Sequence, residues 1–390
     1  MADLDHSTFM RRALELARQG TALASPNPRV GAVIINFRGE IIAEGFHTYE
    51  GVKHAEVLAL EKAGSRARGG TLYLNLEPCC HTGHTGPCVD AIVQARIATV
   101  YAAMQDPNPL VAGKGIERLR AAGVEVHCGV LEAEARALNE AFAKYIVHKA
   151  PLVTLKAGMT LDGKIAPSYT PPSSGMGMGD ATGSWITSQE ARAKVQEMRH
   201  AADAIMVGVN TVITDNPLLT DRTGLRRRRP LLRVVSDSKL RLPLDSRLVQ
   251  TVNNDLVIFC SFAEEKKRAQ LEERGIRVEQ VRAGTPEGRP DIASVVQRLG
   301  EMEITSLIIE GGALVNWTAL AADVVDKVFL FYAPKILAGT GSVPFASGPG
   351  FPRISEAAQV KSIALHRFGE DFAVEGYIRD PYEVAPCSPD

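Results

Sequence analysis

The sequence lacks the features that mark several classes of protein. No stretch approaches about 20 consecutive apolar residues, so no membrane-spanning helix is expected. Lys and Arg number 44 and Asp and Glu 45, without the positive excess of a dedicated nucleic-acid binder. Six cysteines in 390 residues form no disulfide framework, and the first residues carry acids where a signal peptide has a basic region. We therefore expect a cytoplasmic protein that binds neither membrane nor nucleic acid.

The length and the pattern of apolar residues indicate two α/β domains. At about 150 residues per domain, 390 residues suggest two or three domains. Strand-like and helix-like segments alternate in both halves, which favours layered domains with a largely parallel sheet. We predict a first domain over 1–149, a second over 150–380, and a disordered tail over 381–390.

The first half is expected to contain helices at 6–19, 54–63, 88–96, 113–122 and 131–147, and strands at 29–35, 40–44, 71–76, 99–103 and 124–128. The second half is expected to contain strands at 152–156, 204–209, 231–236, 256–260, 276–281, 306–310, 327–332 and 372–378, and helices at 188–201, 262–274, 291–299 and 312–322.

One constellation in the first half predicts a zinc site with a catalytic acid. His54 offers an imidazole, and Cys79 and Cys88 offer thiolates. Three ligands leave one tetrahedral position of Zn²⁺ open for a water molecule, and bound zinc makes that water acidic near neutral pH. Glu56 lies two residues after His54, in the first turn of an expected helix, and can shuttle the protons of a deamination.

Two other interpretations of these residues stay open. Cys80, His81 or His84 could supply a fourth ligand and close a purely structural zinc site. The histidine and the cysteines could also be buried without a metal. The acid at position 56 favours the catalytic interpretation, because a structural site needs no carboxylate there.

The same residues carry a resemblance to a known family. His54-Ala55-Glu56 with Pro78-Cys79 and Cys88 resembles the zinc signature of the cytidine-deaminase-like enzymes, and the eight residues between the cysteines resemble the pyrimidine deaminases of riboflavin biosynthesis. The segments 26–31 and 45–47 are also similar to that branch. The resemblance implies that Asn27, His47 and His81 contact the substrate. The sequence departs from the family at Cys80, usually Ser, and at His84, usually Lys or Arg.

The second half has no Gly-x-Gly-x-x-Gly fingerprint, so a Rossmann domain is not indicated. The expected strand at 306–310 instead runs into Gly311-Gly312 and a helix. Such a turn lets backbone N–H groups approach a phosphate, although it also serves as a plain tight connection.

A set of segments in this half resembles the reductases of riboflavin biosynthesis, which have a dihydrofolate-reductase-like fold and use NADPH. The segments are 156, 159–164, 185–188, 199, 208–220, 310–312 and 333–335. The resemblance implies cofactor contacts by Gly158, Trp185, Thr211, Asp215, Ser238, Gly312, Ala313 and Leu314. It implies substrate contacts by Arg199, Leu219, Arg222 and Glu310, and a catalytic or orienting role for Lys156.

Two segments of the second half leave questions open. The loop between Gly163 and Trp185 is longer than the family pattern, so Thr182, Gly183 and Ser184 compete for one substrate-contacting position. The run Arg226–Arg229 is interpreted as a solvated loop, with contact to RNA or to the 2′-phosphate of NADPH as the alternative.

Together these resemblances imply an N-terminal cytidine-deaminase-like α/β/α domain and a C-terminal dihydrofolate-reductase-like α/β domain. The expected substrate is a phosphorylated aminopyrimidine of riboflavin biosynthesis, which is deaminated with Zn²⁺ and then reduced with NADPH. Homo-oligomers, dimers or tetramers, are expected from the family. The alternatives are a nucleic-acid base deaminase with an RNA-binding second domain, and a zinc-stapled binding protein without activity.

Overall fold

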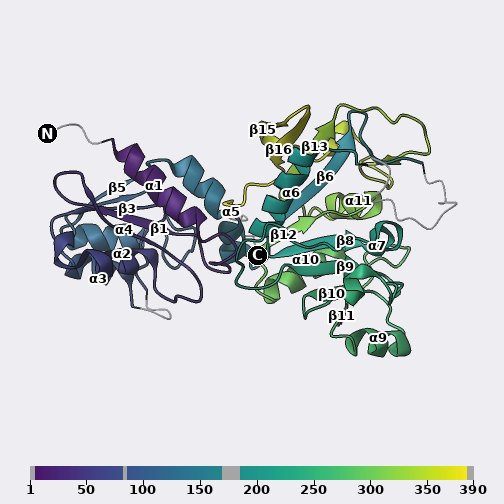
Figure 1. Ribbon diagram of the computed structural model, residues 1–390, viewed down its shortest axis with the longest axis horizontal. Coiled ribbons are helices and arrows are strands. Elements are labelled where there is room, and N and C mark those ends of the chain that lie inside the picture. Colours follow the sequence, from purple (N-terminus) through teal and green to yellow (C-terminus); the bar gives the residue numbers. More distant parts are fainter. Residues whose placement is uncertain (1–4, 82–85, 169–184, 384–390) are drawn as a thin grey trace, which may run out of the picture. The chain divides into compact units, whose positions relative to one another are not determined.

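The structure, a computed structural model, describes residues 5–81, 86–168 and 185–383 (Figure 1). The chain forms two compact units. Of the described residues, one unit comprises 5–81, 86–148 and 226–229, and the other comprises 149–168, 185–225 and 230–383. No helix of the described residues is long and apolar enough to cross a membrane.

The first unit is a sheet between two layers of helices. Its strands are β1 (Gly31–Ile35), β2 (Ile41–Phe46), β3 (Thr71–Leu74), β4 (Thr99–Ala102) and β5 (Glu125–Cys128), in the order β2-β1-β3-β4-β5. Its α-helices are α1 (His6–Arg18), α2 (Ala55–Ala63), α3 (Cys88–Gln94), α4 (Lys114–Ala121) and α5 (Glu132–His148), with a 3-10 turn at Gly64–Ala67. Helices α1 and α5 cover one face of the sheet, and α2, α3 and α4 cover the other (Figure 1).

The pairing of this first sheet corrects one expectation. Strand β1 pairs antiparallel with both β2 and β3, and only β3–β4 and β4–β5 are parallel. The sheet is therefore mixed rather than largely parallel, because the hairpin at its start occupies one edge. The parallel part matters for function, since the loops that follow parallel neighbouring strands emerge at the same edge of the sheet.

The second unit is built on a nine-stranded sheet. Its order is β11-β10-β9-β8-β12-β6-β13-β16-β15, parallel from β11 to β13 and antiparallel for the last two strands. The strands are β6 (Leu152–Thr160), β8 (Ala204–Gly208), β9 (Leu232–Ser236), β10 (Leu256–Cys260), β11 (Arg277–Gln280), β12 (Ser306–Ile309), β13 (Lys327–Ala333), β15 (Lys361–Phe368) and β16 (Asp371–Tyr377). A small separate pair joins β7 (Lys164–Ala166) and β14 (Val343–Pro344).

The helices of this unit are α6 (Gln189–Ala201), α7 (Val209–Asp215), α8 (Arg247–Gln250), α9 (Glu265–Glu272), α10 (Ile292–Glu301) and α11 (Ala313–Ala321), with a 3-10 turn at Ile354–Glu356. Successive residues of a strand point to opposite faces of a sheet. In β8, Ala204 and Met206 accordingly join one hydrophobic cluster, and Ile205 and Val207 join another. Both faces of the central strands are therefore buried, which explains their continuous apolar sequences.

Helices α7 and α8 and strands β7, β14 and β15 of this unit were not predicted from the sequence, and α7 and β15 illustrate why. Helix α7 directly follows β8, where the segment Val209–Asp215 is rich in β-branched residues that form helices poorly in isolation. Strand β15 forms an edge of the sheet, and most of its side chains are exposed, so it lacks the alternating burial of a typical strand. In both cases the rest of the fold, rather than the local sequence, determines the conformation.

Candidate active sites

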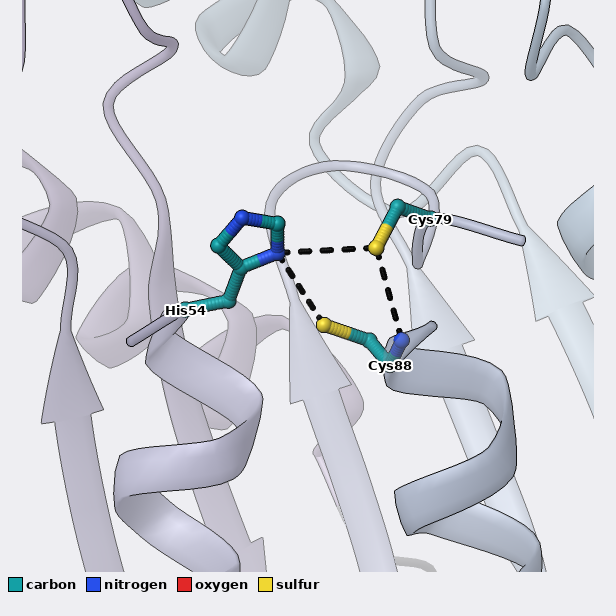
Figure 2. Close-up of side chains that lie close together, drawn as sticks. All are labelled: His54, Cys79 and Cys88. Carbon is teal, nitrogen blue, oxygen red and sulfur yellow. Dashed lines mark hydrogen bonds between the residues drawn. The ribbon is translucent and has the colours of Figure 1, made fainter. Parts of the chain in front are cut away.

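Three predicted metal ligands meet at the ends of helices in the first unit. His54 is the residue before α2, Cys88 opens α3, and Cys79 lies in the loop after β3. The His54 Nδ1 atom lies 3.1 Å from Cys88 Sγ and 3.5 Å from Cys79 Sγ (Figure 2). All three donor atoms lie within 4.8 Å of one another. One imidazole and two thiols in this arrangement fit the donor set of a tetrahedral Zn²⁺ site with an open position.

The two thiols of this site are not equivalent. The Cys88 thiol donates a hydrogen bond to Cys79, which lowers the pKa of Cys79 to about 4, and the same bond raises the pKa of Cys88. The hydrogen bond between His54 and Cys79 raises the pKa of the imidazole. The backbone N–H of Cys88 also donates to Cys79 Sγ, at 3.4 Å. The site thus stabilises negative charge on sulfur, as a thiolate ligand requires.

Glu56 lies in the first turn of α2 with only 4% of its surface exposed. Its Oε2 atom has no hydrogen-bond partner within the described residues. Burial raises the pKa of this carboxyl group. A buried carboxyl oxygen without a partner is costly, and such costs are typical of functional positions. The position fits a group that receives a proton from a reactant.

Two of the three predicted substrate contacts lie together beside the metal ligands. The His47 ring packs edge-on against the His54 ring, with centroids 5.4 Å apart. The Asn27 side-chain amide lies 3.1 Å from His47 Nε2, and the carbonyl of Lys53 lies 3.0 Å from His47 Nδ1. Burial lowers the pKa of His47, so the ring is neutral, with Nδ1–H donating to Lys53 and Nε2 accepting from Asn27. The third residue, His81, is exposed. The next four residues, 82–85, include His84 and lie outside the described residues.

Two buried acids near this site escaped the sequence analysis. Glu77 accepts hydrogen bonds from the backbone N–H groups of Asp106, Gly113, Gly115 and Ile116. It thereby joins the loop that carries Cys79 to the start of α4. Asp106 is buried, and burial raises its pKa to about 7, with Glu77, Cys79 and Glu56 adding to the effect. The order of the strands could have revealed these acids. Glu77 follows β3 and Asp106 follows β4, and the ends of these parallel neighbouring strands lie at the same edge of the sheet.

The second unit contains a cavity of about 650 Å³ at the carboxyl ends of its parallel strands. Such a volume suits an organic cofactor. Seven of the eight predicted cofactor-contacting residues line it: Gly158, Thr211, Asp215, Ser238, Gly312, Ala313 and Leu314. The eighth, Trp185, does not line the cavity. Its ring is exposed, and the Arg192 guanidinium carbon lies 4.7 Å from the centroid of that ring.

Tight backbone packing shapes the floor of this cavity. A Cβ atom at Gly311 would lie 2.7 Å from Val315 Cβ, and one at Gly208 would lie 2.8 Å from Val315 Cγ2. The glycines therefore allow α11 to begin directly against β8 and β12. Backbone N–H groups at the start of this nine-residue helix face a cavity large enough for a dinucleotide, so the residues fit a phosphate-bearing cofactor.

A buried ion-pair network lies at one end of the cavity. Lys156 on β6 places Nζ 3.3 Å from Glu310 Oε2. Arg199 on α6 donates two hydrogen bonds to the same carboxylate, at 2.8 and 3.0 Å. Its Nη1 atom also donates to the Thr220 carbonyl. Burial alone would raise the pKa of Glu310, but the charges of Lys156 and Arg199 lower it to about 2. Lys156 and Glu310 line the cavity, whereas Arg199 supports Glu310 from α6.

The remaining predicted residues of this unit take different positions. Leu219 is buried in a hydrophobic cluster with a φ of 53°. Arg222 is exposed, and its backbone N–H donates to Gln196 Oε1. Neither lines the cavity, so their substrate contacts stay predictions. Thr182, Gly183 and Ser184, and most of the segment 167–180, lie outside the described residues.

The arginine run has a structural role instead of the expected solvated one. Arg226–Arg229 groups with the first unit, where the Arg228 guanidinium lies 3.6 Å from the centroid of the Tyr49 ring and donates to the Ser25 carbonyl. None of the four arginines lines the cavity of the second unit. The run therefore does not supply that cavity's cations.

Comparison with family models matches both halves of the chain. The cytidine and deoxycytidylate deaminase zinc-binding region matches residues 4–104, and the RibD C-terminal domain matches residues 151–374. With the geometry above, these matches define the class of protein: an enzyme that joins a zinc-dependent deaminase domain to a reductase domain.

Individual relatives resemble almost the whole chain. The riboflavin biosynthesis protein RibD of Actinobacillus pleuropneumoniae is 41% identical over 382 residues, covering 98% of this chain and 96% of the relative. Two solved structures are similar to 95% of this chain, and each similarity extends over 98% of the other protein's chain. One is Acinetobacter baumannii RibD, with a TM-score of 0.79 and 31% identity. The other is the diaminohydroxyphosphoribosylaminopyrimidine deaminase/5-amino-6-(5-phosphoribosylamino)uracil reductase of Thermotoga maritima, with a TM-score of 0.78 and 36% identity. The chain belongs to the RibD family.

Proposed function

We propose that this chain catalyses two consecutive steps of riboflavin biosynthesis. The first unit removes the 2-amino group of 2,5-diamino-6-ribosylamino-4(3H)-pyrimidinone 5′-phosphate by hydrolysis. The second unit reduces the ribosyl group of the product, 5-amino-6-(5-phosphoribosylamino)uracil, to a ribityl chain. Membership of the RibD family supports both activities. The observation that carries the first is the buried Glu56 carboxyl, whose Oε2 atom has no hydrogen-bond partner within the described residues, beside His54, Cys79 and Cys88.

In the deaminase site, His54, Cys79 and Cys88 would hold Zn²⁺, which increases the acidity of an attacking water. Glu56 accepts the proton of that water as the oxygen bonds to the ring carbon. The carboxyl group then returns protons to the ring nitrogen and to the amine, the C–N bond breaks, and ammonia leaves. Burial raises the pKa of Glu56, which makes its carboxylate a stronger proton acceptor than an exposed one. His47 and Asn27 form a neutral wall that orients the pyrimidine.

In the reductase site, NADPH would supply the hydride that reaches the anomeric carbon of the sugar. Thr211, Asp215, Ser238 and the Gly312–Leu314 segment would hold the cofactor along the cavity. The ammonium group of Lys156, fixed by Glu310, donates a hydrogen bond to the ring oxygen of the sugar and stabilises the negative charge that develops as the bond between this oxygen and the anomeric carbon breaks. The oxygen takes up a proton from solvent and becomes a hydroxyl of the ribityl chain. Arg199 keeps Glu310 ionised and in place.

We also propose a cytoplasmic location and a homo-oligomeric assembly. The five cysteines of the described residues are free thiols, a state that the reducing cytoplasm maintains. Strand β15 presents Ile363 and Leu365, with exposed fractions of 60% and 72%, at an edge of the large sheet. Apolar side chains on an open edge suit pairing with a second copy. Light scattering of the purified chain measures the assembly.

The test of the two activities follows NADPH oxidation after addition of the diamino substrate. Wild-type protein should oxidise NADPH and release ammonia. The Glu56→Gln variant should keep its zinc, release no ammonia and oxidise NADPH only when the deaminated product is supplied. Ammonia release without NADPH oxidation in the wild type would refute the reductase assignment. An active Glu56→Gln variant would refute the role of Glu56.

A further inference from the structure

Two arginines, Arg241 and Arg289, line the reductase cavity on the side away from Lys156. Arg241 follows β9, and Arg289 precedes α10. Both line the same cavity as Lys156, Glu310 and the start of α11. Neither belongs to the Lys156–Glu310–Arg199 network described above.

The order of the strands separates these arginines from the reacting end. Lys156 lies on β6, and the strands β12, β8 and β9 follow in that order across the sheet. Adjacent strands lie about 4.8 Å apart, so β9 lies roughly 14 Å from β6. Glu310 and Gly311 follow β12, Val209 follows β8, and Ser238 and Arg241 follow β9. The cavity is therefore a path along the strand ends, with Lys156 at one end and Arg241 at the other.

Arg289 is held beside this far end by a chain of contacts. The Ser261 hydroxyl, just after β10, contacts the carbonyl of Ser238 at 3.3 Å and also the carbonyl of Gly288. The backbone N–H of Phe262 donates to the same Ser238 carbonyl, at 2.9 Å. The segment that carries Arg289 is thus fixed to the end of β9, next to the segment that carries Arg241.

The charges of both guanidinium groups are poorly compensated within the described residues. Arg241 donates through Nη2 to Asn210 Oδ1 at 2.8 Å and forms no ion pair there. Arg289 has one acidic neighbour, Glu287, at 3.9 Å, and that carboxylate is mostly exposed. The bond to neutral Asn210 orients Arg241 without neutralising its charge. Two oriented, weakly paired guanidinium groups in one cavity wall suit a dianionic ligand group, which such groups bind with paired hydrogen bonds.

The position of Arg241 and Arg289 in the cavity indicates which anionic group of the cofactor they would bind. A nicotinamide that delivers hydride must lie by Lys156, and the pyrophosphate then lies near the start of α11. The adenosine half of the cofactor accordingly reaches the end of β9. We propose that Arg241 and Arg289 bind the 2′-phosphate of the adenosine ribose and thereby select NADPH over NADH. This inference rests on the proposed reductase function and assigns its cofactor preference to two residues.

Cofactor binding to the full-length protein tests the assignment directly. Calorimetric titrations with NADP⁺, NAD⁺ and 2′-AMP would compare wild type with Arg241→Gln, Arg289→Gln and the double variant. A hydrogen-bonded charge pair is worth about tenfold in affinity, so each single change should weaken NADP⁺ and 2′-AMP about tenfold, and the double change about 100-fold. Binding of NAD⁺ should not change. Arg247→Gln removes an exposed arginine of α8 that does not line the cavity, and it should bind like wild type.

The possible results separate this inference from the function on which it rests. Equal weakening of NADP⁺ and NAD⁺, or no weakening, would overturn the roles of Arg241 and Arg289. Unchanged deamination and unchanged thermal unfolding of the variants would show that they are folded. If wild type oxidises NADPH with the deaminated substrate, the reductase function stands whatever the arginine variants do. If wild type oxidises neither NADPH nor NADH, the reductase function itself fails.

Discussion

The two sites use their residues in contrasting ways. The deaminase site is compact: the donor atoms of the three proposed zinc ligands lie within 4.8 Å of one another, and the proposed catalytic acid lies two residues from one of them. The reductase site is spread along the ends of four strands, and its charged groups pair with one another across 154 and 111 residues of sequence. A compact site fails when one ligand is lost, whereas a spread site divides binding, charge and chemistry among separate elements.

The largest expected effect is loss of one zinc ligand. Replacement of Cys88 by Ser should remove most of the bound zinc and reduce deamination at least about 1,000-fold, because Cys88 is one of three side chains of the described residues that are placed to bind the metal. Reduction of the deaminated substrate should continue at the wild-type rate. Zinc content by mass spectrometry and ammonia release measure the effect. Cys128→Ser, which changes an exposed thiol of β5, is the matched control. Equal loss of both activities would contradict the independence of the two sites.

The second effect concerns stability rather than chemistry. Glu310→Gln leaves Lys156 and Arg199 without their shared carboxylate. Removal of one partner from a buried ion pair costs about 3 to 5 kcal/mol, and we expect the free energy of unfolding of the second unit to fall by about 3 kcal/mol. Denaturant unfolding monitored through reductase activity measures this loss. Glu301→Gln, on the exposed surface of α10, is the control and should have little effect. A Glu310→Gln protein as stable as wild type would show that the network is unimportant for the fold.

The same carboxylate predicts how the second unit responds to acid. Its pKa is lowered in the folded state from an ordinary value of 4.5 to about 2, so ionised Glu310 stabilises the fold fully above pH 4.5. This contribution is lost as the pH falls towards 2 and amounts to about 3 kcal/mol. Unfolding measured between pH 5 and pH 2.5 should become easier in wild type. The Glu310→Gln variant should lack this part of the pH dependence, and identical slopes for both proteins would refute the assignment.

The smallest expected effect tests the support of the deaminase site. Glu77→Gln keeps the size of the side chain but loses charge and acceptor capacity towards four backbone N–H groups. We expect a loss of about 1 to 3 kcal/mol in the stability of the first unit, and weaker zinc binding through the loop of Cys79. Thermal unfolding and zinc competition with a chelator measure these changes. Glu61→Gln, an exposed acid paired with Lys53, is the control. Unchanged zinc affinity in Glu77→Gln would remove its positioning role.

The contrast between the sites also explains what the sequence can predict. The proposed zinc ligands could be selected from the sequence because His54 and Cys88 stand at the starts of helices whose apolar pattern is clear, and because few residue types bind zinc. The role of Glu77 was not predictable from spacing, since it depends on where the loops after β3 and β4 meet. Arg241 and Arg289 pose the same difficulty, because the order of β9, β10 and β11 in the sheet brings their segments together.

We expect that two independent sites in one chain act on successive forms of one substrate. Complementation between two variants tests it most directly: Glu56→Gln lacks the proposed deaminase acid, and Lys156→Met lacks the ammonium group proposed to contact the sugar. Each variant alone should fail to oxidise NADPH when given the diamino substrate. A mixture of the two should restore oxidation, because the deaminated intermediate can pass from one protein to the other. A mixture as inactive as its components, with both variants folded and loaded with zinc, would contradict the claim.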